Sequence, residues 1–159
     1  MRRVFSFAIA GLFVLIVSAA QAQAQTITFN AQLHGGNEVP VVVTGSAGTA
    51  VVTWNTSTRT GTYRVDVYNM PVGTTASHIH VGAPGAGGPV VINFTVPTFI
   101  SNDYALSGTF ACSDVVNRPA QGINSCDDFE QSLLLNNTYV NVHSTANTGG
   151  EIRGQLIRQ

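Results

Sequence analysis

The chain has 159 residues, a formal net charge of −1 and only 9% charged residues. Its seven basic residues are all arginines, and they form no basic stripe. A nucleic-acid-binding protein needs such a stripe to neutralise phosphates, so the composition excludes a nucleic-acid partner. The length suits one domain that buries a sizeable core.

Residues 1–24 have the pattern of a secretory signal peptide. A basic "MRR" precedes an uncharged apolar run over residues 4–19, and "AQAQAQ" over residues 20–25 supplies the A-x-A spacing of a cleavage site. The alternative is an N-terminal membrane anchor, because about 16 apolar residues approach the length of a short span. We expect cleavage, which leaves residues 25–159 as one secreted or periplasmic domain without a further membrane span.

Period-two alternation of apolar and polar residues predicts an all-β fold. In residues 26–34, alternate side chains are apolar and predict one buried face. Similar runs, separated by Gly, Pro, Asn and Thr, predict an antiparallel β-sandwich or a flattened Greek-key-like barrel. The expected strands cover residues 26–34, 48–55, 61–69, 76–82, 89–94, 104–110, 138–143 and 151–157.

One segment, "SCDDFEQSLLLNN", predicts a short helix in a connection. Ser125 or Asp127 could cap its first turn, where acidic residues favour the helix dipole. Phe129 and Leu133 are four residues apart, so both could face the core.

The two cysteines, Cys112 and Cys126, predict a disulfide, because an even pair in a secreted chain normally oxidises. The alternative is a thiolate metal site. No C-x-x-C or H-x-x-x-H motif accompanies the pair, so the disulfide is favoured.

The stretch "SHIHV" places two histidines on one face of a strand. Ile79 and Val81 share the face that goes to the core, so His78 and His80 point away from it. Two imidazoles on one strand face can converge on a metal ion, and imidazole suits copper and zinc. A third ligand from a neighbouring strand would complete the site, and His143 is the natural candidate. The alternative is that these histidines are solvated or hydrogen-bonded without a metal.

The final hairpin brings further polar residues toward His143. Symmetric pairing about "STANTGG" sets His143 opposite Glu151 and Asn141 opposite Arg153. This register predicts one polar patch, although a slip of one residue would remove it.

Three motifs carry a resemblance to a known family: "FNAQLHGGNEVP", "SHIHVGAPGAGGPVV" and "YVNVHSTANTGGEIRGQL". In this order they resemble the CHRD domain, which is named after the extracellular protein chordin and occurs singly in secreted bacterial proteins. The resemblance covers residues 25–159. It carries no established biochemical activity, and chordin's growth-factor binding does not transfer to a chain of one domain.

A fainter resemblance is to copper–zinc superoxide dismutase. His78 and His80 match its H-x-H pair, "VNVH" with His143 matches a later copper histidine, and Arg153 matches an anion-guiding arginine, in the same order. No histidine lies between His80 and His143, so the bridging ligand and the zinc cluster are missing. The resemblance implies at most a mononuclear copper site, with Asn141 and Glu151 as supporting residues.

The leading hypothesis is an exported, non-enzymatic binding module that holds copper or a similar transition metal through three histidines. The first alternative is a dismutase-like copper oxidoreductase in which Arg153 steers the anion. The second is a metal-free structural or adhesive envelope module that meets an extracytoplasmic protein or glycan.

Overall fold

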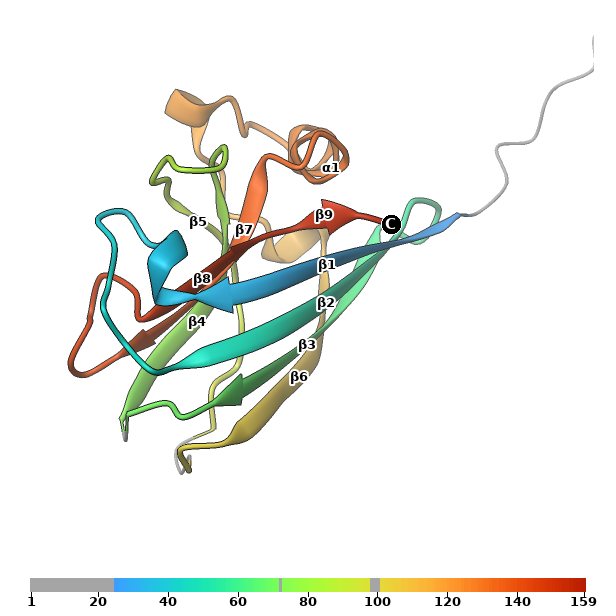
Figure 1. Ribbon diagram of the computed structural model, residues 1–159. Coiled ribbons are helices and arrows are strands. Elements are labelled where there is room, and N and C mark those ends of the chain that lie inside the picture. Colours follow the sequence, from blue (N-terminus) through green and yellow to red (C-terminus); the bar gives the residue numbers. More distant parts are fainter. Residues whose placement is uncertain (1–24, 72, 98–100) are drawn as a thin grey trace, which may run out of the picture.

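The computed structural model describes residues 25–71, 73–97 and 101–159 (Figure 1). The predicted signal peptide therefore lies outside the described residues. The strands are β1 Thr26–His34, β2 Ala47–Asn55, β3 Thr60–Tyr68, β4 Thr74–Val81, β5 Val90–Asn93, β6 Tyr104–Ala111, β7 Thr138–Ser144, β8 Ile152–Gln155 and β9 Ile157–Arg158. The helices are α1 Cys126–Leu134 and three short 3-10 turns, Gly35–Asn37, Cys112–Asp114 and Pro119–Gln121. The prediction of an all-β fold with one short helix is confirmed.

The strands form one antiparallel sheet in the order β5-β4-β7-β8-β1-β2-β3-β6, and β9 pairs with β1. The sheet curls into a nearly closed, barrel-like shape (Figure 1). One wall consists of β1, β2, β3 and β6, and the other of β5, β4, β7 and β8. We call these the first and the second wall.

The core lies between the two walls because each strand sends alternate side chains inward. In β1 the predicted inward residues Ile27, Phe29, Ala31 and Leu33 are all buried, while Thr26, Asn30, Gln32 and His34 are exposed. The second wall contributes Ile79, Val140, Val142 and Ile152, which are fully buried. Alternation alone had placed the inward residues of β1 and Ile79 on the buried face.

The open side of the curled sheet is closed by aromatic packing. Tyr63 of β3 stacks on Phe94, which follows β5, with ring centroids 3.8 Å apart. The Thr95 N–H also donates a 3.0 Å hydrogen bond to the Tyr63 hydroxyl. These contacts join the end of the second wall to the first wall.

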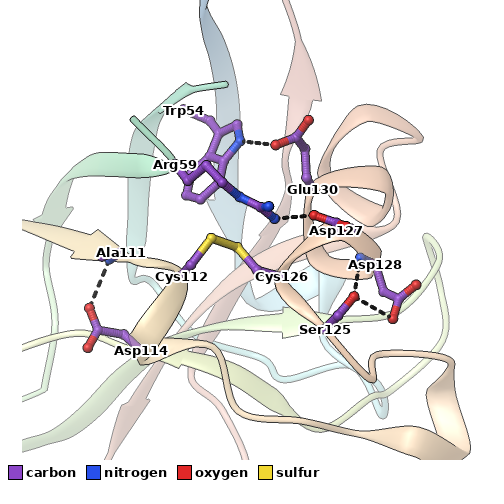
Figure 2. The surroundings of a disulfide bond; sticks show 10 residues. All are labelled: Trp54, Arg59, Ala111, Cys112, Asp114, Ser125, Cys126, Asp127, Asp128 and Glu130. Carbon is purple, nitrogen blue, oxygen red and sulfur yellow. Dashed lines mark hydrogen bonds and ion pairs between the residues drawn. A yellow bond between two sulfur atoms is a disulfide. The ribbon is translucent and has the colours of Figure 1, made fainter. Parts of the chain in front are cut away.

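Helix α1 covers one end of the core and is tied to it by a disulfide (Figure 2). Ser125 is the N-cap, and its hydroxyl accepts a hydrogen bond from the Asp128 N–H. Phe129 is fully buried and meets the ring of Trp54 edge-on, while the Trp54 indole N–H donates to Glu130 at 2.8 Å.

The predicted disulfide between Cys112 and Cys126 is present, with the two Cα atoms 5.3 Å apart. It connects the end of β6 to the first residue of α1. Among the described residues, no helix has the length and apolar character needed to cross a membrane.

Candidate metal centre

The pairing of β4 with β7 brings three histidines together. His78 lies opposite Asn141, His80 opposite Tyr139, and His143 opposite Ala76. All three imidazoles leave the sheet on the face turned away from the core. Each offers a nitrogen, and the three nitrogens lie within 4.8 Å of one another. The predicted third ligand, His143, therefore does reach the H-x-H pair.

The histidine cluster is shielded from solvent, unlike the polar face of an ordinary surface strand. His80 and His143 are each only 8% exposed. Three connecting segments, residues 35–46, 82–89 and 145–151, supply groups that contact this face. The cluster is therefore a covered polar site on the outer side of the second wall.

The hydrogen bond of His80 decides which of its nitrogens is available. Its Nδ1 lies 2.8 Å from the carbonyl oxygen of Gly88. Because a carbonyl only accepts, Nδ1 carries the proton and the lone pair is on Nε2. That Nε2 is buried and has no hydrogen-bond partner in the described part of the chain. A buried acceptor without a partner is uncommon, and an ion or an ordered water at this position would satisfy it.

His143 is oriented in the same way. Its Nδ1 lies 2.9 Å from the carbonyl oxygen of Thr148, so it donates its proton there and presents Nε2 as an acceptor. This Nε2 lies 3.1 Å from Nδ1 of His78. Without a metal, His78 therefore donates to His143. Backbone carbonyls that fix imidazole tautomers in this manner are typical of metal-binding histidines.

The surroundings of His78 and His80 keep these two imidazoles neutral. Burial, with smaller contributions from the nearby His143 and His80, lowers the pKa of His78 to about 4. Burial also lowers the pKa of His80 to about 4, although its hydrogen bond to Gly88 opposes the shift. Neutral imidazole is the form that binds metal, so protons do not compete for these two groups near pH 7.

The spacing suits a single ion after a modest contraction. Metal–imidazole bonds are about 2.0 Å long, so ligands on one ion lie about 3.3 to 3.5 Å apart. The His78–His143 pair is already at 3.1 Å, and the widest pair, within 4.8 Å, would have to close by up to about 1.5 Å. Three neutral nitrogen donors match the preference of copper or zinc.

Arg153 does not face the imidazoles, because the ring of Tyr139 lies between them. The His80 ring stacks on Tyr139 with centroids 4.8 Å apart, and the Arg153 guanidinium carbon lies 3.4 Å from the centroid of the same ring. Strands β4 and β8 flank β7, so the two groups contact opposite faces of Tyr139. The guanidinium donates to the carbonyl of Ala83 at 3.2 Å.

Asn141 is held by a buried acid. Its side-chain N–H donates to Glu38 at 2.8 Å, and burial raises the pKa of Glu38 to about 7 against the opposing effect of Arg153. Gly150 leaves room for this pair: with φ at 139°, a Cβ there would lie 2.5 Å from the Asn141 amide nitrogen.

Glu151 supports the turn that follows His143 rather than an imidazole. It is 1% exposed and accepts hydrogen bonds from Ser144 at 2.8 Å and from Asn147. Burial alone would raise its pKa, but hydrogen bonds from side chains including Thr44 and Asn147 bring it below the usual value. The carboxylate thereby holds residues 144–147, which lead to Thr148.

The predicted register of the last hairpin is confirmed where β7 and β8 pair. Asn141 lies opposite Arg153 and Val142 opposite Ile152. Within the described residues, no hydrogen bond joins Asn141, Glu151 or Arg153 to an imidazole. These three predicted residues therefore lie around the histidine cluster but do not hydrogen-bond to its nitrogens.

The family model of the CHRD domain matches residues 29–156. The chain belongs to the CHRD family. No curated protein and no solved structure matches it. The matched CHRD region contains all three histidines and the three segments that cover them.

Sequence reasoning missed three residues of the CHRD site: Glu38, Gly88 and Tyr139. The local sequence around Glu38 and Gly88 is that of ordinary turns, and nothing in it indicates a functional role. Both lie within the motifs that identified the CHRD domain, "FNAQLHGGNEVP" and "SHIHVGAPGAGGPVV". The signal that could have found them is that these CHRD motifs extend beyond the strands into the adjoining loops.

Proposed function

We propose that this CHRD protein is an exported, non-enzymatic module that binds one copper ion, or a similar late transition metal, through His78, His80 and His143. The observation that carries the proposal is the buried Nε2 of His80, which has no partner in the described chain. An unsatisfied buried acceptor costs about 1–3 kcal/mol, and a bound cation would remove that cost.

Copper is favoured over other divalent ions for two reasons. Imidazole is a good copper ligand, and affinity along the first-row series reaches its maximum at Cu²⁺. The two histidines with lowered pKa values stay neutral to about pH 5, so the site keeps its donors in a mildly acidic medium.

Export is supported by two independent features. Residues 1–24 have the signal-peptide pattern, and the Cys112–Cys126 disulfide is typical of oxidising compartments.

The test is a calorimetric titration of the purified protein with Cu²⁺, Cu⁺ under reducing conditions, and Zn²⁺. We expect one copper per chain and a loss of affinity of about 100-fold or more in His78→Ala/His143→Ala. His80→Phe keeps a ring against Tyr139 but removes the free nitrogen, so it should lose affinity similarly. His34→Ala is the matched control, because His34 is exposed at the end of β1 and lies outside the cluster.

Equal, weak copper binding by the wild type and the His78→Ala/His143→Ala variant would refute the metal site and favour the metal-free envelope module. Metal-loaded protein should also be assayed for superoxide removal through cytochrome c reduction. A rate no greater than that of free copper is expected for a binding module. A much greater rate that disappears in His80→Phe would favour the dismutase-like oxidoreductase.

A further inference from the structure

We propose that a cavity beside the histidine cluster binds a small organic carboxylate with an apolar body, and that Arg153 is the residue that pairs with the carboxylate. This inference goes beyond the proposed metal site and does not depend on it. It rests on the shape of the cavity, the surroundings of one buried arginine and the character of the walls.

The cavity has a volume of about 410 Å³ and lies between residues 36–41 and residues 84–85. This volume falls in the range of small-molecule sites, about 300–1,000 Å³. Arg153 and Gln155 of β8 contribute the strand side of the lining. The cavity is thus formed by the second wall and by two of the segments that cover it.

Arg153 is a buried cation that forms no ion pair with any described residue, although Glu38, whose pKa burial raises to about 7, lies near enough to feel its charge. The residue is only 3% exposed, and the ion pairs among the described residues, Arg59–Asp127 and Arg64–Asp66, do not include it. Its guanidinium has five N–H donors. Within the described chain it donates one side-chain hydrogen bond, to the carbonyl oxygen of Ala83. A buried charge is costly unless it is paired, so an anion in the cavity would be stabilising.

The guanidinium is held in one orientation before any ligand arrives. The Tyr139 ring supports one of its faces at 3.4 Å, and the Ala83 carbonyl fixes one Nη atom. A planar fork held in this way matches the two oxygens of a carboxylate with little loss of side-chain entropy.

The remaining lining selects an organic acid rather than an inorganic anion. Val39, Val41 and Pro84 form apolar walls, and Val39 and Val41 are 49% and 65% exposed. An alkyl chain would cover this apolar surface while its carboxylate reaches Arg153. Glu38 also lines the cavity, and burial raises its pKa to about 7, so below that pH it is neutral and does not repel the ligand.

The test uses hexanoate as the probe, with hexanamide as its uncharged match, on the metal-free protein at pH 6. We expect saturable hexanoate binding, followed by calorimetry or by shifts of the backbone amides of residues 36–41 and 84–85. Hexanamide should bind at least about tenfold more weakly, because it cannot form a charge-assisted pair with Arg153.

Two rim substitutions provide a matched pair that leaves the fold intact. Val41→Asp places a negative charge on the cavity wall, whereas Val43→Asp places the same charge on a fully exposed residue that does not line the cavity. We expect about a tenfold loss of hexanoate affinity for Val41→Asp and less than a twofold change for Val43→Asp. Arg153→Lys keeps the charge but removes the fork, and should weaken binding by about tenfold.

The carboxylate site is refuted if hexanoate binds no more tightly than hexanamide, or if the two aspartate variants weaken it equally. These results are separable from those on the metal site. His78→Ala/His143→Ala should abolish copper binding and leave hexanoate binding within twofold, while Val41→Asp should leave copper binding unchanged.

Discussion

The two walls of the sheet have the same alternating pattern, but the outward face of the first wall is exposed and that of the second wall is buried. On the first wall, β3 alternates between buried and exposed residues, and the side chain of the outward Arg64 is 59% exposed. On the second wall all seven residues of β7 are buried, and the outward Arg153 is 3% exposed. Two arginines that occupy equivalent positions in the pattern therefore lie in opposite environments.

The difference shows that a polar strand face becomes a site when loops cover it. Covered polar groups must find partners, and most of them do. Four buried side-chain polar atoms of the described residues have none, and three of these, on His80, Thr138 and Asn141, belong to β4 and β7. Two of these atoms, on His80 and Asn141, lie on the covered outward face, where a ligand can reach them, whereas Thr138 lies on the inward face with Val140 and Val142.

We expect the largest effect on the difference between the two walls from displacing a segment that covers the second wall. A Cβ on Gly88 would lie 1.7 Å from the carbonyl oxygen of Val81, whereas a Cβ on Gly87 would meet no atom within 4 Å. We expect Gly88→Ala to lower the free energy of unfolding by about 3 kcal/mol and Gly87→Ala to change it by less than 1 kcal/mol. Urea unfolding of both variants measures this. Equal stabilities would show that residues 82–89 do not need the observed approach to β4.

A second comparison sets the two outward arginines against each other. Arg153→Ala should cost about 2 kcal/mol, because it removes the contact with the Tyr139 ring and the bond to Ala83. Arg64→Ala removes an exposed ion pair with Asp66 and should cost less than about 0.5 kcal/mol. Thermal and urea unfolding provide the values. A cost for Arg64→Ala that matches Arg153→Ala would contradict the distinction between the walls.

The smallest expected effect is the pH dependence of stability that Glu38 causes on the covered second wall. The folded pKa of Glu38 is about 7 against 4.5 in the unfolded chain, so between these values the folded state binds more protons. Its contribution is complete below pH 4.5 and is lost as the pH rises through 7. From pH 5 to 8, wild type should therefore lose on the order of 1 kcal/mol relative to Glu38→Gln.

Urea midpoints of both proteins at several pH values test this expectation. Arg153 and Glu151 act on the same carboxyl, and their effects are already part of its folded pKa. A difference that is flat, or that grows in favour of wild type with rising pH, would show that Glu38 is not held in its neutral form.

Much of the fold could be predicted because burial acts on short stretches of sequence. β1 was predicted at its observed ends, and Phe129 and Leu133 of α1 are both buried as their spacing indicated. The disulfide followed from the count of cysteines. Elsewhere the strand ends differ by at most two residues, because hydrogen-bond pairing rather than pattern decides where a strand stops.

The site could be predicted only in part. His78, His80 and His143 were identified from alternation and the family resemblance, and they meet because β4 pairs with β7. Glu38 could not be assigned a place, because nothing local in "NEVP" shows that its side chain reaches Asn141, 103 positions along the chain. Gly88 lies in a glycine-rich segment, residues 82–89, that has the composition of a loose turn, yet its carbonyl orients His80.

The amino-acid sequence by itself determined which side chains leave the core, because the period of a strand and the preference of apolar groups for the interior require no knowledge of distant segments. Only the tertiary structure decided that one outward face is covered by residues 35–46, 82–89 and 145–151. Coverage depends on long-range contacts, and these change the environment of His80 and Arg153 from solvated to buried. Both walls have polar outward faces, but only on the second wall are these side chains buried, and that burial makes the histidines and Arg153 candidates for binding.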